Sequence, residues 1–185
     1  MLLDTPICDF GWPAPVFTLP DADGVPHRMA DHLGERGLLV AFLCNHCPYV
    51  QAIAARLAAD TRTLIDEGTA VLAVMSNDWR AVPADSPENM KRFAARHGFA
   101  FPYLVDTEQS VGKAYGAVCT PDFFGLNAKG ELQYRGRLDD LGIGARGGDA
   151  ANRTPELLNA MRLIAETGEG PRDQTASMGC SIKWR

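Results

Sequence analysis

An uninterrupted apolar segment, Leu38–Leu43, is the feature that most constrains how this chain can fold. A segment of this length with no polar face predicts a strand that is buried on both sides of a sheet. Directly after it, apolar residues recur at helical spacing and predict a helix over Tyr49–Glu67 that ends at Gly68. A buried strand that leads into a long helix is typical of an α/β layered protein.

The rest of the chain continues this alternation of strands and helices. Two hairpins are predicted, one with its turn at Asp23-Gly24 and one around Asn127–Gly130. We therefore expect an α/β fold with a mixed central sheet, in one domain over residues 1–185, with an irregular tail over 168–185. The further predicted elements are strands over 16–19, 71–75, 102–105, 123–126 and 131–137, and helices over 87–97, 110–115 and 154–166.

Charge and composition exclude several classes of function. The chain has 18 basic and 23 acidic residues, a formal net charge of −5, which argues against nucleic acid or an anionic membrane as its main partner. The segment Met1–Pro6 lacks the basic and apolar stretches of a signal peptide, so we expect a cytoplasmic protein. Five cysteines are too few to build a disulfide framework, and in the cytoplasm they indicate a catalytic, sensing or metal-binding role.

The motif Cys44-Asn45-His46-Cys47 lies where the buried strand ends and the long helix begins. A helix N-terminus presents unpaired N–H groups and a positive dipole end, and both stabilise a thiolate. Cysteines in such motifs have pKa values of roughly 3.5 to 7.5. We expect a cationic His46 to stabilise the Cys44 thiolate further. Two cysteines at this spacing can also close a disulfide and exchange it with a partner, so the motif predicts a redox-active pair that needs no cofactor.

Two other interpretations of this motif remain open. The cysteines could be two packed thiols without chemistry. Alternatively, a metal-binding or redox-sensing module could use Cys44, His46 and Cys47, with a fourth ligand from elsewhere in the chain. The chain has no second C-x-x-C, which favours the redox interpretation and no metal. The candidate fourth ligands are Cys119, Cys180 and Cys8.

A family resemblance adds to this reading. Strand, C-x-x-C, long helix, strand, helix and then Thr120-Pro121 before a hairpin resembles the thioredoxin fold, with an N-terminal hairpin extension. The segment Trp12–Asp21 resembles the start of the alkyl hydroperoxide reductase/thiol-specific antioxidant family. The chain is most similar to a peroxiredoxin-like subgroup of thioredoxin-family proteins. That similarity is carried by Phe42–Val50, Ser86–Met90, Cys119–Phe124, Tyr134–Asp140 and Gly179–Trp184.

The resemblance implies a thiol–disulfide oxidoreductase in cell redox homeostasis. Cys44 matches the attacking cysteine of thioredoxins, and Cys47 matches the resolving one. Pro121 matches the cis-proline that faces the disulfide, and Thr120 offers backbone contacts to a bound polypeptide. The expected partners are protein or small-molecule disulfides and thiols.

The alternative function is that of a thiol peroxidase acting on peroxides, because Cys44 also falls where peroxiredoxins keep their peroxidatic cysteine. Cys44 would become a sulfenic acid that Cys47, Cys119 or Cys180 resolves. The family's T-x-x-C threonine, whose hydroxyl helps to orient the peroxide, is replaced here by Ala41.

Two arginines and one further cysteine are auxiliary candidates. Arg135 and Arg137 occupy alternate positions of a predicted strand, which places both on one face. In one interpretation, one of these arginines approaches Cys44, as a peroxiredoxin arginine does. In the other, the pair forms a salt-bridged face with Asp139 and Asp140 nearby. Cys180, in the tail, could fold back over the site as an auxiliary thiol or be incidental.

Overall fold

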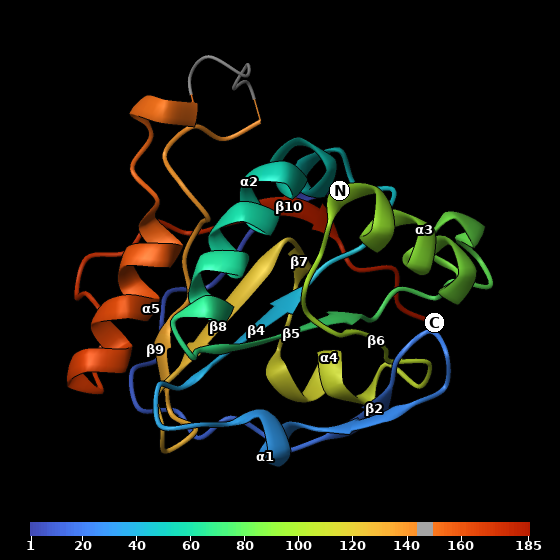
Figure 1. Ribbon diagram of the computed structural model, residues 1–185. Helices are drawn as coiled ribbons and strands as arrows, with labels where there is room; N and C mark the ends of the chain where they lie inside the picture. The colour runs from blue at the N-terminus through green and yellow to red at the C-terminus, as the bar shows by residue number, and fades with distance from the viewer. Residues whose placement is uncertain (144–149) are drawn as a thin grey trace.

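A five-stranded sheet forms the centre of the protein (Figure 1). The computed structural model describes residues 1–143 and 150–185. Along the sheet the order is β6-β5-β4-β8-β9, in which β4 pairs parallel with β5 and antiparallel with β8. The predicted α/β fold with a mixed sheet is confirmed. The strands are β4 (Leu38–Phe42), β5 (Ala70–Met75), β6 (Tyr103–Val105), β8 (Asp122–Leu126) and β9 (Leu132–Tyr134).

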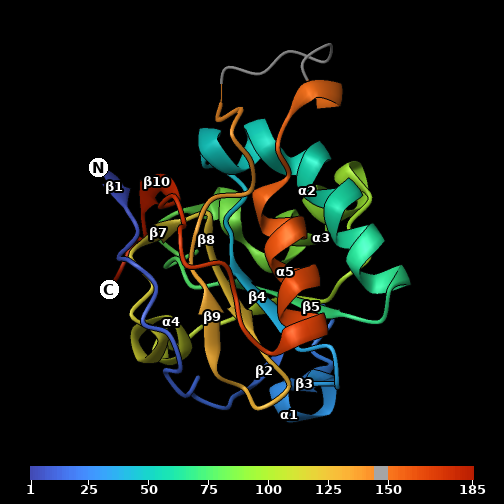
Figure 2. The same ribbon diagram turned by 90° about the vertical axis from the view of Figure 1, so that its left-hand side faces the viewer.

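Helices cover both faces of this sheet, which explains the apolar segment that forms β4 (Figures 1 and 2). Leu39 and Ala41 point into a core shared with α2 and α5, whereas Val40 and Phe42 point into a second core on the other face. All five β4 residues are buried, as predicted. The helices are α1 (Met29–His32), α2 (Pro48–Asp66), α3 (Pro87–His97), α4 (Ser110–Tyr115) and α5 (Glu156–Thr167), with 3-10 turns η1 (Pro83–Asp85) and η2 (Ala150–Asn152).

The N-terminal hairpin is present as predicted. It consists of β2 (Thr18–Pro20) and β3 (Pro26–Arg28), which pair antiparallel. The side chain of Asp21 accepts hydrogen bonds from the backbone N–H groups of Asp23 and Val25 and so fixes the turn. Gly24 adopts a φ of 84°, a conformation that favours glycine.

The expectation of an irregular tail is wrong for its last part. Met178–Ser181 form β10, which lies between β1 (Leu2–Asp4) and β7 (Cys119–Thr120) in a second sheet (Figure 2). The pairing depends on close backbone contact, because a Cβ at Gly179 would lie 1.9 Å from the carbonyl oxygen of Thr120. Strands this short carry no alternating pattern that sequence reasoning could detect.

No helix within the described ranges combines the length and apolar character that a bilayer crossing requires.

Candidate redox site

The cysteine pair sits at the junction of β4 and α2. Cys47 is the N-cap residue of α2, and Pro48 takes its first helical position, where its missing N–H is no loss. Both thiols are buried, with 1% of Cys44 and 0% of Cys47 exposed. The predicted location at a helix N-terminus is therefore confirmed, but the pair is covered by other parts of the protein.

Thr120 and Pro121 provide part of that cover. The peptide bond between them is cis, as the resemblance implied. The Thr120 hydroxyl lies 3.1 Å from Cys44 Sγ, and its carbonyl oxygen lies 3.2 Å from Cys47 Sγ, where it accepts the S–H of a protonated Cys47. One residue on β7 thus contacts both sulfurs.

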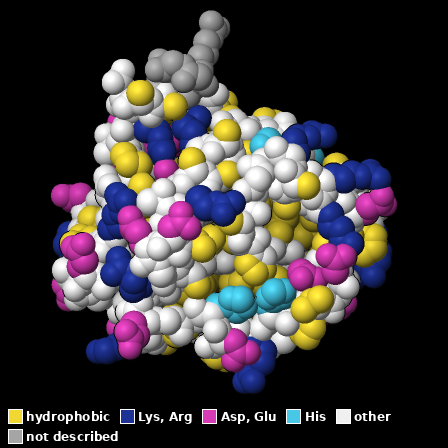
Figure 3. All heavy atoms as spheres, viewed as in Figure 1, with side chains coloured by type: hydrophobic (Ala, Val, Ile, Leu, Met, Phe, Trp, Pro, Cys, Tyr) yellow, Lys and Arg dark blue, Asp and Glu magenta, His cyan; other side chains and the backbone are white. Residues whose placement is uncertain are grey.

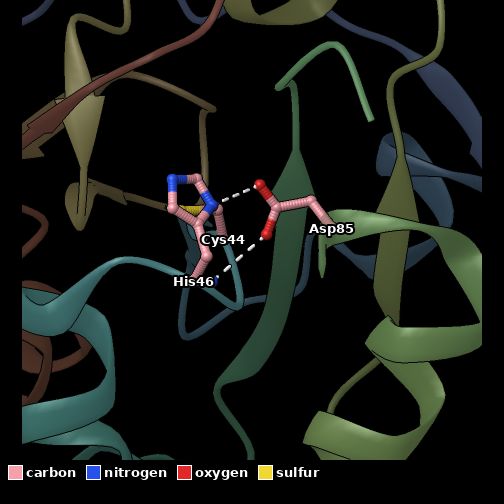
Figure 4. A group of neighbouring side chains, drawn as sticks. All are labelled: Cys44, His46 and Asp85. Carbon is pink, nitrogen blue, oxygen red and sulfur yellow. Dashed lines mark hydrogen bonds and ion pairs between the residues drawn. The ribbon is translucent and has the colours of Figure 1, made fainter. Parts of the chain in front are cut away.

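Asp85, which the sequence analysis missed, organises the turn between the two cysteines (Figure 4). Its carboxylate is fully buried and accepts hydrogen bonds from the backbone N–H groups of Asn45 (2.7 Å) and His46 (3.3 Å). It also bonds His46 Nδ1 (2.7 Å) and accepts from the Asn77 side chain (2.8 Å). Asp85 belongs to η1, far from the motif in sequence, and only its position just before the predicted N-cap Ser86 could have drawn attention to it.

The His46–Asp85 pair is ionised over a wide pH range. The hydrogen bond from Asp85 raises the pKa of His46. Burial acts to raise the pKa of Asp85, but hydrogen bonds from His46 and Asn77 outweigh it and lower that pKa. A cationic His46 beside the cysteine pair, which the sequence analysis expected, is therefore supported by a partner that it did not foresee.

The thiols of Cys44 and Cys47 titrate as one pair, because the ionisation of each disfavours that of the other. The proximity of the two thiols, together with Cys180 and the backbone N–H of Val50, lowers the pKa at which this pair loses its first proton. The pKa for loss of the second proton is raised, because a second thiolate would lie beside the first, in a buried place and close to Asp85. The pair therefore loses one proton readily and keeps the second, which the two sulfurs share.

We predict that replacing Asp85 with Asn lowers the pKa of His46. The variant keeps the size of the side chain but removes its negative charge. The unfolding free energy should fall by about 1–3 kcal/mol, because the buried donors around Asp85 lose an ionised acceptor. The contribution of His46 to the unfolding free energy is fully present below the pKa of His46 in the unfolded chain, and it is lost as pH rises through the raised pKa of the folded state. The contribution of Asp85 is lost as pH falls through its lowered folded pKa. The stability loss is therefore largest between about pH 4 and pH 6.5.

NMR titration of the His46 ring and urea unfolding across this pH range check the prediction. Asp78→Asn is the control, since Asp78 lies in the same connection and accepts from the backbone N–H of Arg80. An unchanged His46 titration in Asp85→Asn would contradict it.

Each of the two arginines pairs with a carboxylate. β9 ends at Tyr134, so Arg135 and Arg137 do not share one strand face. Arg135 forms a salt bridge with Asp122 and lies over the Phe124 ring, on the sheet face opposite Cys44. Arg137 forms a salt bridge with Glu156 of α5. Both arginines are salt-bridged, as the second interpretation in the sequence analysis expected, but their partners are carboxylates other than Asp139 and Asp140.

The three other cysteines have different surroundings. Cys180 on β10 pairs with Thr120 and packs against the core that holds Cys44 and Cys47. Cys119 precedes Thr120 on β7, so its side chain projects to the opposite side, where burial raises its pKa to about 12. Cys8 packs in the second core. The structure thus brings Cys180 to the thiol pair and directs Cys119 away from it.

Metal-ligating atoms do gather at the site. One ligand atom each from Cys44, His46 and Asp85 lie within 4.8 Å of one another. The Asp85 oxygens, however, already accept four hydrogen bonds, and a metal ion would displace some of these donors. This arrangement favours the redox interpretation over the metal-binding one.

A second histidine cluster lies apart from the thiols. His27 and His32 hydrogen bond to one another at 3.4 Å, and Asp21 bonds the other nitrogen of His27 at 3.0 Å. Figure 3 shows histidine side chains over the region of β2 and α1, below a hollow lined by hydrophobic side chains. These two histidines come from the hairpin extension and its short helix, not from the elements that hold the cysteine pair.

A pocket of about 470 Å³ opens beside Pro121. Apolar side chains make up much of its lining, with Asp4, Arg137 and Asp139 as charged members. The apolar lining residues include Tyr49, Ile53, Leu138, Ile143 and Met178.

Comparison with known proteins identifies the family. The model of the AhpC/TSA family matches residues 10–135. The chain belongs to this family. A Mycobacterium tuberculosis protein whose name describes it as a peroxiredoxin is 32% identical over 130 residues, 70% of this chain and 77% of that protein. The thiol-disulfide oxidoreductase ResA of Geobacillus thermodenitrificans is 27% identical over 123 residues, 66% of each protein.

A solved structure matches the whole chain. The crystal structure of an uncharacterized conserved protein from Geobacillus kaustophilus has a TM-score of 0.90 at 35% identity and covers 100% of this chain and 97% of that one. More distant solved structures, below 25% identity, show that the fold is thioredoxin-like. This AhpC/TSA family member is a peroxiredoxin-like redox enzyme, and its homologues include both peroxiredoxins and thiol-disulfide oxidoreductases.

Proposed function

We propose that this AhpC/TSA family protein is a thiol–disulfide oxidoreductase that uses a Cys44–Cys47 dithiol and disulfide. The observation that carries the proposal is the geometry of the pair. Two thiols lie at the N-terminus of α2, and Thr120 contacts both of them beside the cis Pro121. This arrangement suits a pair that alternates between dithiol and disulfide.

The exchange proceeds through a mixed disulfide. Cys44, as the thiolate, attacks a sulfur of the substrate disulfide and releases the first substrate thiolate. That thiolate takes the proton of Cys47, and Cys47 attacks Cys44 Sγ. The second substrate thiolate leaves, and the Cys44–Cys47 disulfide forms. Two electrons have moved from the protein to the substrate.

The apolar pocket beside Pro121 is the proposed place for the substrate. Its size and lining suit an apolar peptide segment or a small disulfide, and Pro121 in its lining directly follows Thr120, which contacts both sulfurs. The proposal includes the cytoplasmic location that the sequence suggests. It assigns no role to nucleic acid or membrane, in keeping with the net charge of −5.

Trapping of the intermediate tests this function. In Cys47→Ser, the resolving thiol is absent, so oxidised glutathione should leave a stable adduct on Cys44 that peptide mass spectrometry identifies. Wild-type protein should instead accumulate the Cys44–Cys47 disulfide, and its reduction potential can be measured in glutathione buffers. A Cys47→Ser protein that forms no adduct on Cys44 would count against the proposal. Cys8→Ser is the control.

A second candidate function is that of a thiol peroxidase, and two observations favour it. The Thr120 hydroxyl at 3.1 Å from Cys44 Sγ replaces, from another strand, the hydroxyl that Ala41 lacks. Cys44 is also only 1% exposed, which a small peroxide tolerates better than a protein disulfide does. Rapid mixing of reduced protein with hydrogen peroxide decides the matter, because a peroxidase consumes peroxide in a burst and forms a Cys44 sulfenic acid.

We predict that Thr120→Val slows the reaction of Cys44 in either function. The substitution keeps the shape of the side chain and the backbone carbonyl that faces Cys47, but it removes the hydrogen bond that lowers the Cys44 pKa. A hydrogen bond to a charged group contributes about 1.5–3 kcal/mol, or about one to two pKa units. Thiolate absorbance of Cys44 in a Cys47→Ser background measures this rise. An unchanged titration would show that the hydroxyl does not act on the thiolate.

A further inference from the structure

Strand register places a third sulfur at the redox site. In the antiparallel pair of β7 and β10, Cys180 lies directly opposite Thr120. Residues that face each other in this way project to the same side of the sheet. Because the Thr120 side chain points at Cys44, the side chain of Cys180 points toward the thiol pair as well.

Cys47 has two thiol neighbours. Its thiol faces the carbonyl of Thr120, the residue opposite Cys180, and it lies within electrostatic range of the thiols of both Cys44 and Cys180. The contacts of β10 with α2, whose N-cap is Cys47, hold this arrangement. A sulfur with two thiol neighbours can form a disulfide with either of them.

The three sulfurs differ in how far they reach solvent. Cys44 and Cys47 are 1% and 0% exposed, whereas Cys180 is only partly buried. A partner that must touch a sulfur of the oxidised protein therefore has little access to a Cys44–Cys47 disulfide and better access to Cys180.

We propose that Cys180 exchanges with the Cys44–Cys47 disulfide to form a second disulfide, Cys47–Cys180, which presents the oxidising equivalent at the surface to a dithiol reductant. The inference rests on the proposed function, since it starts from the Cys44–Cys47 disulfide. In the exchange, Cys180 attacks Cys47 Sγ, the Cys44–Cys47 bond breaks, and the Cys180 proton passes to the released Cys44. No electrons enter or leave in this step.

The outer disulfide is then reduced by the partner. A thiolate of the dithiol attacks Cys180 Sγ, forms a mixed disulfide with it, and expels the Cys47 thiolate. The second thiol of the partner then attacks the mixed disulfide and releases Cys180 as a thiol. Two electrons have passed from the dithiol to the protein.

Disulfide mapping tests whether the second disulfide forms. The Cys44→Ser variant is oxidised with diamide, blocked with maleimide and mapped by peptide mass spectrometry. We expect an intramolecular Cys47–Cys180 disulfide in this variant, its loss in Cys44→Ser/Cys180→Ser, and its retention in Cys44→Ser/Cys8→Ser. A Cys44→Ser protein that keeps both thiols, while wild type still forms Cys44–Cys47, overturns the inference and leaves the proposed function standing. If wild type forms no Cys44–Cys47 disulfide, the proposed function itself fails.

A kinetic experiment tests the route of reduction. Oxidised wild type, Cys180→Ser and Cys8→Ser are mixed with dithiothreitol, and the return of free thiols is followed by quenching with maleimide. We expect slower reduction of Cys180→Ser only, with the reduction potential of its Cys44–Cys47 disulfide still measurable. Equal rates in wild type and Cys180→Ser would show that the reductant reaches the inner disulfide directly and would overturn the route.

Discussion

Gly179→Ala should destabilise the protein and withdraw Cys180 from the redox site. A Cβ at this position would lie 1.9 Å from the carbonyl oxygen of Thr120 and 2.5 Å from its carbonyl carbon. Both are backbone atoms and cannot swing aside as a flexible side chain would. Forcing atoms into a packed region costs about 1–3 kcal/mol, and the strain is relieved only if β10 moves away from β7.

Two measurements separate these effects. Urea unfolding gives the loss of stability, and the rate of maleimide labelling of Cys180 reports the displacement of β10. In a Cys44→Ser background, Gly179→Ala should also reduce the yield of the Cys47–Cys180 disulfide. The matched control is Gly34→Ala, because a Cβ at Gly34 meets no atom within 4 Å. If Gly179→Ala had the same stability and the same rate of Cys180 labelling as wild type, the close contact of β7 and β10 would not be required.

Arg135→Met should cause the largest loss of stability of any variant considered so far. Arg135 donates to both carboxylate oxygens of Asp122, at 3.2 and 2.9 Å, and Asp122 is 0% exposed. Removing one partner of a buried ion pair costs about 3–5 kcal/mol, because the remaining charge is left without compensation. The reactivity of Cys44 should not change, since Arg135 lies on the other face of the sheet.

The pH dependence of this loss identifies its cause. Burial raises the pKa of Asp122, and loss of Arg135 should raise it further. A carboxyl group with a raised folded pKa binds more protons in the folded state, so falling pH stabilises the variant relative to wild type. The loss should therefore shrink as pH falls through that pKa. Asp122→Asn/Arg135→Met should recover part of it, because no buried charge remains.

Arg137→Met is the matched control for this pair. Its partner Glu156 is partly exposed, and such ion pairs contribute about 0–1 kcal/mol. A loss in Arg135→Met as small as that of the control would contradict the uncompensated-charge explanation. If Arg135→Met instead kept normal stability but Cys44 reacted more slowly, the result would support the peroxiredoxin-like role that the sequence suggested for this arginine.

Local sequence patterns were sufficient for most of the fold. A few neighbouring residues are enough to predict three of its elements. These are β4 from its apolar segment, α2 from its helical spacing and the start of α3 from its Ser86 cap. β1 and β10 could not be found in this way, because strands of three and four residues depend on a partner that is distant in sequence. Their pairing is visible only as a tertiary contact, through Gly179.

The same distinction applies to the site. Cys44, Cys47, Thr120 and Pro121 stand in recognisable motifs, and the structure brings them together. Asp85 and the position of Cys180 are set by long-range packing, so no spacing rule could place them. For Arg135, the strand pattern indicated a shared face with Arg137. However, β9 ends earlier than predicted, and the Arg135 guanidinium forms a salt bridge with the buried carboxylate of Asp122.

The late position of β10 in the chain also affects how the enzyme is made. During synthesis, β4 and α2 leave the ribosome before Met178–Ser181 do. A nascent chain therefore carries Cys44 and Cys47 without the strand that packs against α2 and without Cys180. Oxidation at that stage can produce only the inner of the two disulfides, so the reductive route through Cys180 becomes available only when translation of the chain has passed β10.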